Sequence, residues 1–244
     1  GNYGVNRDDF ESIETAVNGV VVRELEDEPS NFRSGMSLGD VLMMKGVPGI
    51  QGIDTRKLTR ILREKGALKG MLTAAGDTVS VEDKLEYVKA YKLPTNLVTR
   101  VSTKKAYPSP GRGERVVLID CGMKHGILRE LNKRDCDVIV VPFNTPSNVI
   151  LSLFPDGIVL SNGPGNPEDV QVTIDIIKEL LGKAPIFGIG LGHQVLALAG
   201  GAKTVKLKNG HRGGNHPVKD LLSGRTELTV QNHGYAVEEA SLSG

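Results

Sequence analysis

Two glycine-rich segments carry the residue types best suited to chemistry. The first is Ser161–Pro167 (SNGPGNP), and the second is Gly188–Gln194 (GIGLGHQ). Glycine lets the backbone approach a ligand closely and adopt positive φ, and it leaves N–H groups exposed that can hold a developing oxyanion. Either segment alone could equally be a tight turn. Two of them after neighbouring strands favour a ligand site.

The second segment is compatible with only one of three known loop types. Gly188 and Gly190 begin a dinucleotide fingerprint, but His193 stands where the third glycine belongs. No acidic residue ends a strand about 20 residues later, as ribose recognition requires. A phosphate P-loop is excluded because no G-K-[ST] follows. A nucleophile elbow is also a sharp strand–turn–helix connection flanked by glycines, and it presents one side chain at a helix N-terminus, where the pKa of a thiol is lowered. Position 190 would supply that side chain, but it is glycine and has no group that can attack.

The elements around these segments predict an α/β domain. Continuous apolar runs predict four strands that are buried on both faces, at 116–119, 138–141, 157–160 and 185–189. Helical patterns follow them, at 127–133, 149–154, 170–181 and from 191 through 198. Such alternation predicts a parallel sheet, which binds ligands at the carboxyl ends of its strands. Two additional strands are expected at 204–207 and 227–231.

The first part of the chain predicts a smaller α/β domain. Val20–Val22 is a β-branched strand candidate, Ser37 caps a helix, Asp54 begins a helix that Gly66 ends, and residues 81–91 are amphipathic. Residues 107–113 (YPSPGRG) contain two prolines and two glycines, which neither a helix nor a central strand tolerates. We therefore expect a first domain over 1–106, a linker over 107–113 and a second domain over 114–244.

Composition narrows the function classes. The 244 residues include 30 Lys and Arg against 29 Asp and Glu, a net charge of +1 that argues against nucleic acid or membrane surfaces as partners. Two cysteines fit a reducing compartment better than a disulfide scaffold. No apolar run reaches membrane-spanning length, and the first residues (GNYG) lack the features of a signal peptide. A cytoplasmic protein is expected.

Longer motifs resemble those of the class I glutamine amidotransferases, and more specifically the small, glutamine-hydrolysing subunits of carbamoyl-phosphate synthase. The second domain carries them at Pro155–Pro167, Phe187–Gln194, Gly210–Val218 and Gln231–Val237. The first domain contains Ser30–Arg33 and Gly52–Arg60, which are typical of this subunit but not of amidotransferases in general. The resemblance therefore covers nearly the whole chain.

This resemblance implies a parallel-sheet class I glutamine amidotransferase domain, preceded by part of a smaller α/β N-terminal domain. In the family, a cysteine thiolate attacks the amide of L-glutamine, backbone N–H groups hold the oxyanion, and a His–Glu pair handles protons. The released ammonia passes to the large subunit, which uses ATP and Mg to make carbamoyl phosphate for arginine and pyrimidine synthesis. The small subunit itself needs no cofactor. Motif matches place the glutamine contacts at Gly163, Gly165, Leu191, Gln194, Asn232, Gly234 and Tyr235.

Two departures from the family pattern concern catalysis. Gly190 stands where the family has its nucleophilic cysteine, through an engineered change, a natural loss or the transcription of a modified cysteine. The family's His-Pro-Glu segment lies further on, and His216-Pro217-Val218 is not that segment. The resemblance therefore predicts a subunit that binds glutamine without hydrolysing it. The alternatives are a non-catalytic scaffold for an ammonia-dependent synthase and, less favoured, a nucleotide-binding regulatory domain.

Several other residues are interpreted as structural or surface residues and not as parts of a site. Cys121 ends a strand, where a lone cysteine is usually a small buried hydrophobe. Cys136 lies between two aspartates and is expected to be solvated or half-buried. No Cys or His pair has compact zinc spacing, so no metal site is predicted. The basic run Arg56–Arg63 is expected to be a solvated helix face or a contact to the partner subunit.

Overall fold

The computed structural model describes residues 4–242, and the chain forms two compact units that divide between Leu93 and Pro94. This division lies before the expected linker at 107–113, of which residues 107–109 form a strand of the second unit's sheet. Of the first residues (GNYG), on which the expectation about a signal peptide rests, only Gly4 lies within the described range. No helix in residues 4–242 is long and apolar enough to cross a membrane.

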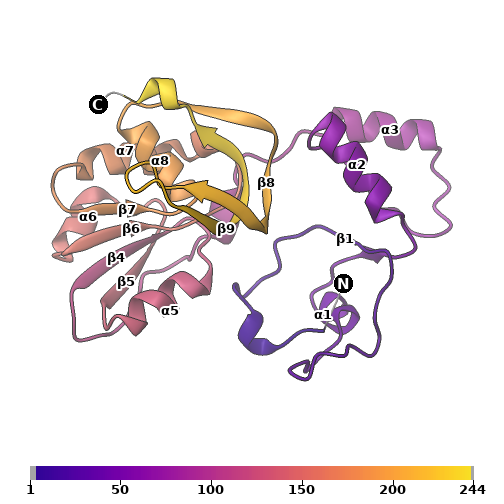
Figure 1. Ribbon diagram of the computed structural model, residues 1–244, viewed down its shortest axis with the longest axis horizontal. Coiled ribbons are helices and arrows are strands. Elements are labelled where there is room, and N and C mark those ends of the chain that lie inside the picture. Colours follow the sequence, from indigo (N-terminus) through magenta and orange to yellow (C-terminus); the bar gives the residue numbers. More distant parts are fainter. Residues whose placement is uncertain (1–3, 243–244) are drawn as a thin grey trace. The chain divides into compact units, whose positions relative to one another are not determined.

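The first unit consists of short elements whose ends follow from local sequence (Figure 1). Ser37 and Asp40 form a capping box, and Asp54 accepts a hydrogen bond from the Lys57 N–H at 2.9 Å. Gly66 ends its helix at φ +88°. The strands and helices expected here are thereby confirmed. The elements are η1 (Arg7–Asp9), β1 (Val20–Val21), α1 (Leu38–Met44), β2 (Gly49–Ile50), α2 (Thr55–Lys65) and α3 (Val81–Ala90), with β1 and β2 paired in parallel.

The second unit is built on a five-stranded sheet, which follows the short helix α4 (Leu97–Val101). The spatial order of the strands is β3 (Tyr107–Ser109), β5 (Asp137–Pro142), β4 (Arg115–Asp120), β6 (Gly157–Leu160) and β7 (Ile186–Gly188). The last four are parallel, as predicted, and β3 pairs antiparallel with β5 at the sheet edge. Pro108 is tolerated because an edge strand does not need every N–H.

Helices cover both faces of this sheet, and each face has its own core (Figure 1). Alternate residues of β4 show the division, since Val117 and Ile119 point into one core and Val116 and Leu118 into the other. Helix α5 (His125–Lys133) packs on the second core. The first core is covered by α6 (Ser147–Ser152), η2 (Pro167–Val170), α7 (Gln171–Leu180) and α8 (Leu191–Ala199). The expected burial of strands on both faces is confirmed for β4, β5 and β6. It is wrong for β7, an edge strand in which Phe187 is 65% exposed.

A long antiparallel ribbon follows the sheet. It consists of β8 (Thr204–Lys219) and β9 (Thr226–Val237), and a short turn of helix, η3 (Glu239–Ser241), comes after it. Both strands extend beyond the expected 204–207 and 227–231. The expectation stopped short because the middle of β8 is rich in glycine and polar residues, which carry no apolar period. Two register shifts interrupt the pairing, between Lys206 and His211 and between Gly213 and His216.

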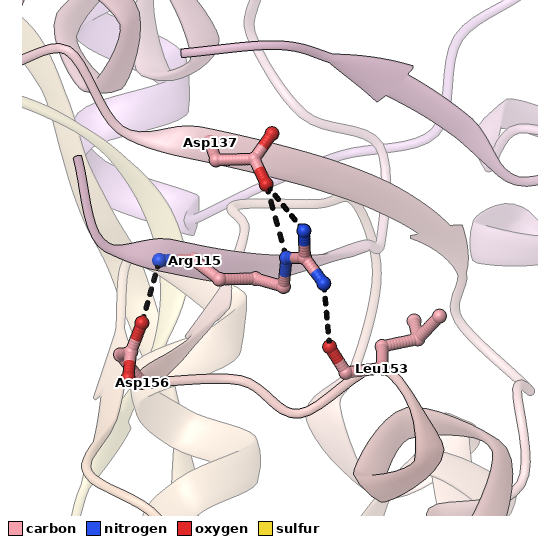
Figure 2. Close-up of polar contacts among 4 residues, drawn as sticks. All are labelled: Arg115, Asp137, Leu153 and Asp156. Carbon is pink, nitrogen blue, oxygen red and sulfur yellow. Dashed lines mark hydrogen bonds and ion pairs between the residues drawn. The ribbon is translucent and has the colours of Figure 1, made fainter. Parts of the chain in front are cut away.

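The amino ends of the sheet strands are tied together by Arg115 (Figure 2). Its guanidinium donates to Asp137 on β5 at 2.8 and 3.0 Å and to the Leu153 carbonyl at 3.4 Å. Its backbone N–H donates to the Asp156 carboxylate at 2.8 Å. This cluster closes the end of the sheet opposite the glycine-rich segments, so its role is structural.

Candidate functional site

The two glycine-rich segments meet at the carboxyl ends of the neighbouring strands β6 and β7. The Ile189 N–H donates to the Leu160 carbonyl at 3.0 Å, and the Gly192 N–H donates to the Ser161 carbonyl at 3.1 Å. Between them, Gly190 connects β7 to α8 with φ +58° and ψ −113°. This is the sharp strand–turn–helix connection of a nucleophile elbow, in which the backbone of the central residue is strained.

The elbow has glycine at three alternate positions, 188, 190 and 192, and these positions differ in whether a side chain would fit. A Cβ on Gly188 would lie 2.6 Å from the Gly192 carbonyl oxygen, and one on Gly192 would lie 2.4 Å from the Leu160 carbonyl oxygen. Both positions therefore require glycine. A Cβ on Gly190 would meet nothing closer than the Asn162 Cβ at 3.4 Å, which is ordinary contact. Only position 190 has room for a side chain.

Backbone donors border this position. A Cβ on Gly163 would lie 2.2 Å from the Cys121 carbonyl oxygen and 2.7 Å from Leu191 Cδ2, so Gly163 packs directly against Leu191. Leu191 is the first residue of α8, where helix N–H groups have no acceptor within the helix. Gly165 takes φ +96° further along the same loop. Gly165 lies near Leu97, with Leu97 Cδ1 3.5 Å from where its Cβ would be. Gly163 and Leu191 therefore form the rim of the elbow, at the N-terminus of α8, and a helix N-terminus favours anions.

Two polar residues that sequence reasoning did not select hold this rim. The buried Asp120 carboxylate accepts hydrogen bonds from the N–H groups of Thr103, Gly122 and Met123, at 2.7 to 2.8 Å. Asn162 accepts from the Lys124 N–H at 2.9 Å and donates to the Gly122 carbonyl at 3.2 Å. The signal that could have found Asp120 is a carboxylate at the end of an otherwise apolar strand.

Gln194 links the elbow helix to the ribbon. Its side chain is only 7% exposed, and its Nε2 donates to the Tyr235 carbonyl on β9 at 2.7 Å. Burial, with the carboxylates of Asp169 and Glu168, raises the pKa of the Tyr235 phenol.

The remaining expected glutamine contacts, Asn232 and Gly234, lie on the same strand as Tyr235. Asn232 is exposed and pairs with Arg212 across the ribbon, and a Cβ on Gly234 would lie 3.5 Å from Arg212 Nη2. The structure thus brings Gly163, Gly190 and Leu191 together at the elbow. A hydrogen bond connects Gln194 to Tyr235, and Asn232 and Gly234 lie on β9.

The cysteines and histidines form no alternative centre within residues 4–242. Cys121 is fully buried, and burial, followed by the Asp120 carboxylate, raises the pKa of its thiol to about 12. It is therefore no substitute nucleophile, as expected of a buried hydrophobe. Cys136 is half-buried, also as expected. No group of three or more His, Cys, Asp or Glu side chains in the described range is arranged to hold a metal ion.

Family models match both parts of the chain. Glutamine amidotransferase class-I matches residues 117–244, which include every expected site residue, and carbamoyl-phosphate synthase small chain, CPSase domain, matches residues 1–72. The chain belongs to the carbamoyl-phosphate synthase small chain family. The elbow and its flanking glycines are therefore those of a class I amidotransferase domain in a carbamoyl-phosphate synthase small chain.

Individual proteins that are similar to this chain support the same family. The carbamoyl phosphate synthase small chain of Bacillus cereus (strain ATCC 10987 / NRS 248) is 61% identical over 99% of this chain and 66% of its own length. The pyrimidine-specific small chain of Bacillus subtilis (strain 168) is 60% identical over 99% and 66%. The small chain of Listeria innocua serovar 6a is 58% identical over 100% and 67%. The chain thus spans about two thirds of the length of these relatives.

One solved structure is more distant. A chain from Thermoplasma acidophilum, described as part of a GMP synthase, is 24% identical over 52% of this chain and 69% of its own. Its TM-score is 0.44, which is too low to support a conclusion about fold or function.

Proposed function

We propose that this chain is the glutamine-binding part of a carbamoyl-phosphate synthase small chain that binds L-glutamine without hydrolysing it. The observation that carries the proposal is the elbow at Gly190, which has the backbone and the space for a side chain but has no nucleophile. The surrounding residues supply polar groups and open backbone of the kind that recognises an amino acid.

The missing step can be stated in terms of atoms. A thiolate on residue 190 would attack the side-chain amide carbon of glutamine, and the N–H groups of Leu191 and Gly163 would face the resulting oxyanion. Collapse would form a thioester, break the C–N bond and release ammonia after the nitrogen takes up a proton. With Gly190 no S–C bond can form, so the site stops at binding.

The partner under this proposal is the large chain of the same synthase, in which ATP and Mg would act and to which a hydrolysing small chain would pass ammonia. A scaffold role is the second candidate, favoured by the same absence of a nucleophile. It requires that the chain bind the large chain and support synthesis from free ammonia, with no need for glutamine to bind.

The test compares the full-length protein carrying Gly190 with its Gly190→Cys variant. Calorimetry measures glutamine binding to the Gly190 form, and ammonia release measures hydrolysis by both forms. We expect the Gly190 form to bind glutamine without releasing ammonia and the Gly190→Cys form to release it. Equal hydrolysis by the two forms would overturn the assignment of position 190, and absence of glutamine binding would favour the scaffold.

A further inference from the structure

Two histidines face each other across the ribbon, next to the residues that link it to the elbow helix. His211 on β8 and His233 on β9 are direct register partners, and His211 Nδ1 lies 3.0 Å from His233 Nε2. The other ring nitrogen of His233, Nδ1, lies 2.7 Å from the Tyr235 carbonyl oxygen. That oxygen also accepts from Gln194.

The acceptors in this cluster determine where the protons lie. A carbonyl oxygen only accepts, so His233 must carry its proton on Nδ1 and donate it to Tyr235. In the neutral ring, Nε2 is then a lone-pair acceptor, so His211 must donate from Nδ1. The result is a directed chain of hydrogen bonds from His211 to His233 to the Tyr235 carbonyl.

The backbone of β8 is built to bring His211 to this place. The register runs from the Lys206–Tyr235 pair directly to the His211–His233 pair, so β8 contains a bulge between these points. Gly210 closes the bulge at φ +64°, and a Cβ there would lie 2.0 Å from the His233 carbonyl oxygen. Only glycine fits, and the bulge aims the next residue, His211, at His233.

We propose that His211 is a positioning residue of the glutamine site, acting through His233 to orient the Tyr235 carbonyl and the Gln194 side-chain amide. This inference rests on the proposed glutamine binding. Because the Tyr235 carbonyl accepts from both His233 and Gln194, it fixes Gln194 with Nε2 inward and Oε1 available as an acceptor. A ligand amide or ammonium N–H is the group that such an oxygen accepts.

The test uses the full-length Gly190 protein, in which glutamine binding can be measured without turnover. His211→Leu removes the donor, whereas His211→Asn places an amide N–H close to the position of Nδ1. We expect His211→Leu to raise the Kd for glutamine roughly three- to tenfold, the effect of one neutral hydrogen bond. His211→Asn should stay within about twofold of the parent.

His216→Leu is the matched control, because its ring contacts His211 at a centroid distance of 5.3 Å but lies outside the relay. Its Kd should be unchanged. A glutamine Kd unaffected by His211→Leu would overturn the proposal.

A second readout does not depend on glutamine. Ring ¹⁵N NMR of the unliganded protein at slightly alkaline pH should show His233 as the Nδ1–H tautomer, and His211→Leu should shift it toward a mixture. An Nε2–H tautomer of His233 in the parent would overturn the relay. Failure of glutamine to bind would instead overturn the proposed function, so the two failures are distinguishable.

Discussion

The N–H of Gly192 donates to the carbonyl of Ser161 at 3.1 Å, so one hydrogen bond joins the two glycine-rich segments across neighbouring strands. The close approach is feasible because residue 192 has no side chain. The same approach leaves Gly190 at the apex with room around it. The elbow therefore keeps the shape of a nucleophile site independently of whether a nucleophile is present.

The elbow glycines should differ in how they tolerate alanine. Gly192→Ala drives a Cβ to within 2.4 Å of the Leu160 carbonyl oxygen, and we expect it to lower the free energy of unfolding by about 3 kcal/mol. Gly190→Ala meets only backbone strain, at φ +58° and ψ −113°, and should cost about 2 kcal/mol. Urea midpoints measure both.

Gly182→Ala is the control for strain alone, since Gly182 takes φ +76° with nothing within 4 Å of a Cβ. It should cost no more than Gly190→Ala. A Gly190→Ala variant as unstable as Gly192→Ala would contradict the open space assigned to position 190.

Gln194 should respond differently to loss of its amide and to gain of a charge. Gln194→Met removes one of two donors to the Tyr235 carbonyl and should cost about 1 kcal/mol of stability. Gln194→Glu places a carboxylate against that carbonyl in a site only 7% exposed, and should cost about 2 to 3 kcal/mol at neutral pH. Urea unfolding at pH 7 ranks the two, and the opposite order would contradict the assigned amide orientation.

The sequence predicted those parts of the fold that depend on local patterns. The caps at Ser37 and Asp54 and the four parallel strands follow from side-chain chemistry and apolar runs that need no distant partner. The apolar run at 185–189 wrongly predicted burial on both faces, because β7 lies at the sheet edge and its Phe187 is 65% exposed. The edge strand over Tyr107–Ser109 was not predicted. Its proline, Pro108, excludes a central strand but not an edge position, and only pairing with β5 distinguishes the two.

The site was predicted where glycine spacing or a family motif marked it. The meeting of Gly163, Gly190 and Leu191 follows from their place at the ends of neighbouring strands. The His211–His233 pair could not be predicted, because a bulge shifts the register of β8 and no local pattern encodes a three-dimensional partner. All seven glutamine contacts expected from the family motifs remain predictions: Gly163, Gly165, Leu191, Gln194, Asn232, Gly234 and Tyr235.

Asp120 should be sensitive to a change of a single atom. Its two carboxylate oxygens accept from three backbone N–H groups, with Oδ2 facing Thr103 and Oδ1 facing Gly122 and Met123. Asp120→Asn replaces one oxygen with an NH₂ group that opposes an N–H donor, and should lower the free energy of unfolding by about 2 kcal/mol. Urea unfolding measures this, and a loss below about 0.5 kcal/mol would contradict this pattern of hydrogen bonds.

The Cys121 thiol should make stability depend on alkaline pH. Burial, and secondarily the Asp120 carboxylate, raises its pKa from 9.0 to about 12. A raised pKa in the folded state means that the unfolded chain loses its proton first. The stabilising contribution is therefore complete below pH 9 and is lost as pH rises toward 12, by at most about 1.4 kcal/mol per pH unit.

Urea midpoints between pH 8 and 11 should fall more steeply for the parent than for Cys121→Ala. The Cys136→Ala variant, which alters a half-buried thiol, should fall as the parent does. Equal slopes for the parent and Cys121→Ala would show that the thiol is not protected by burial.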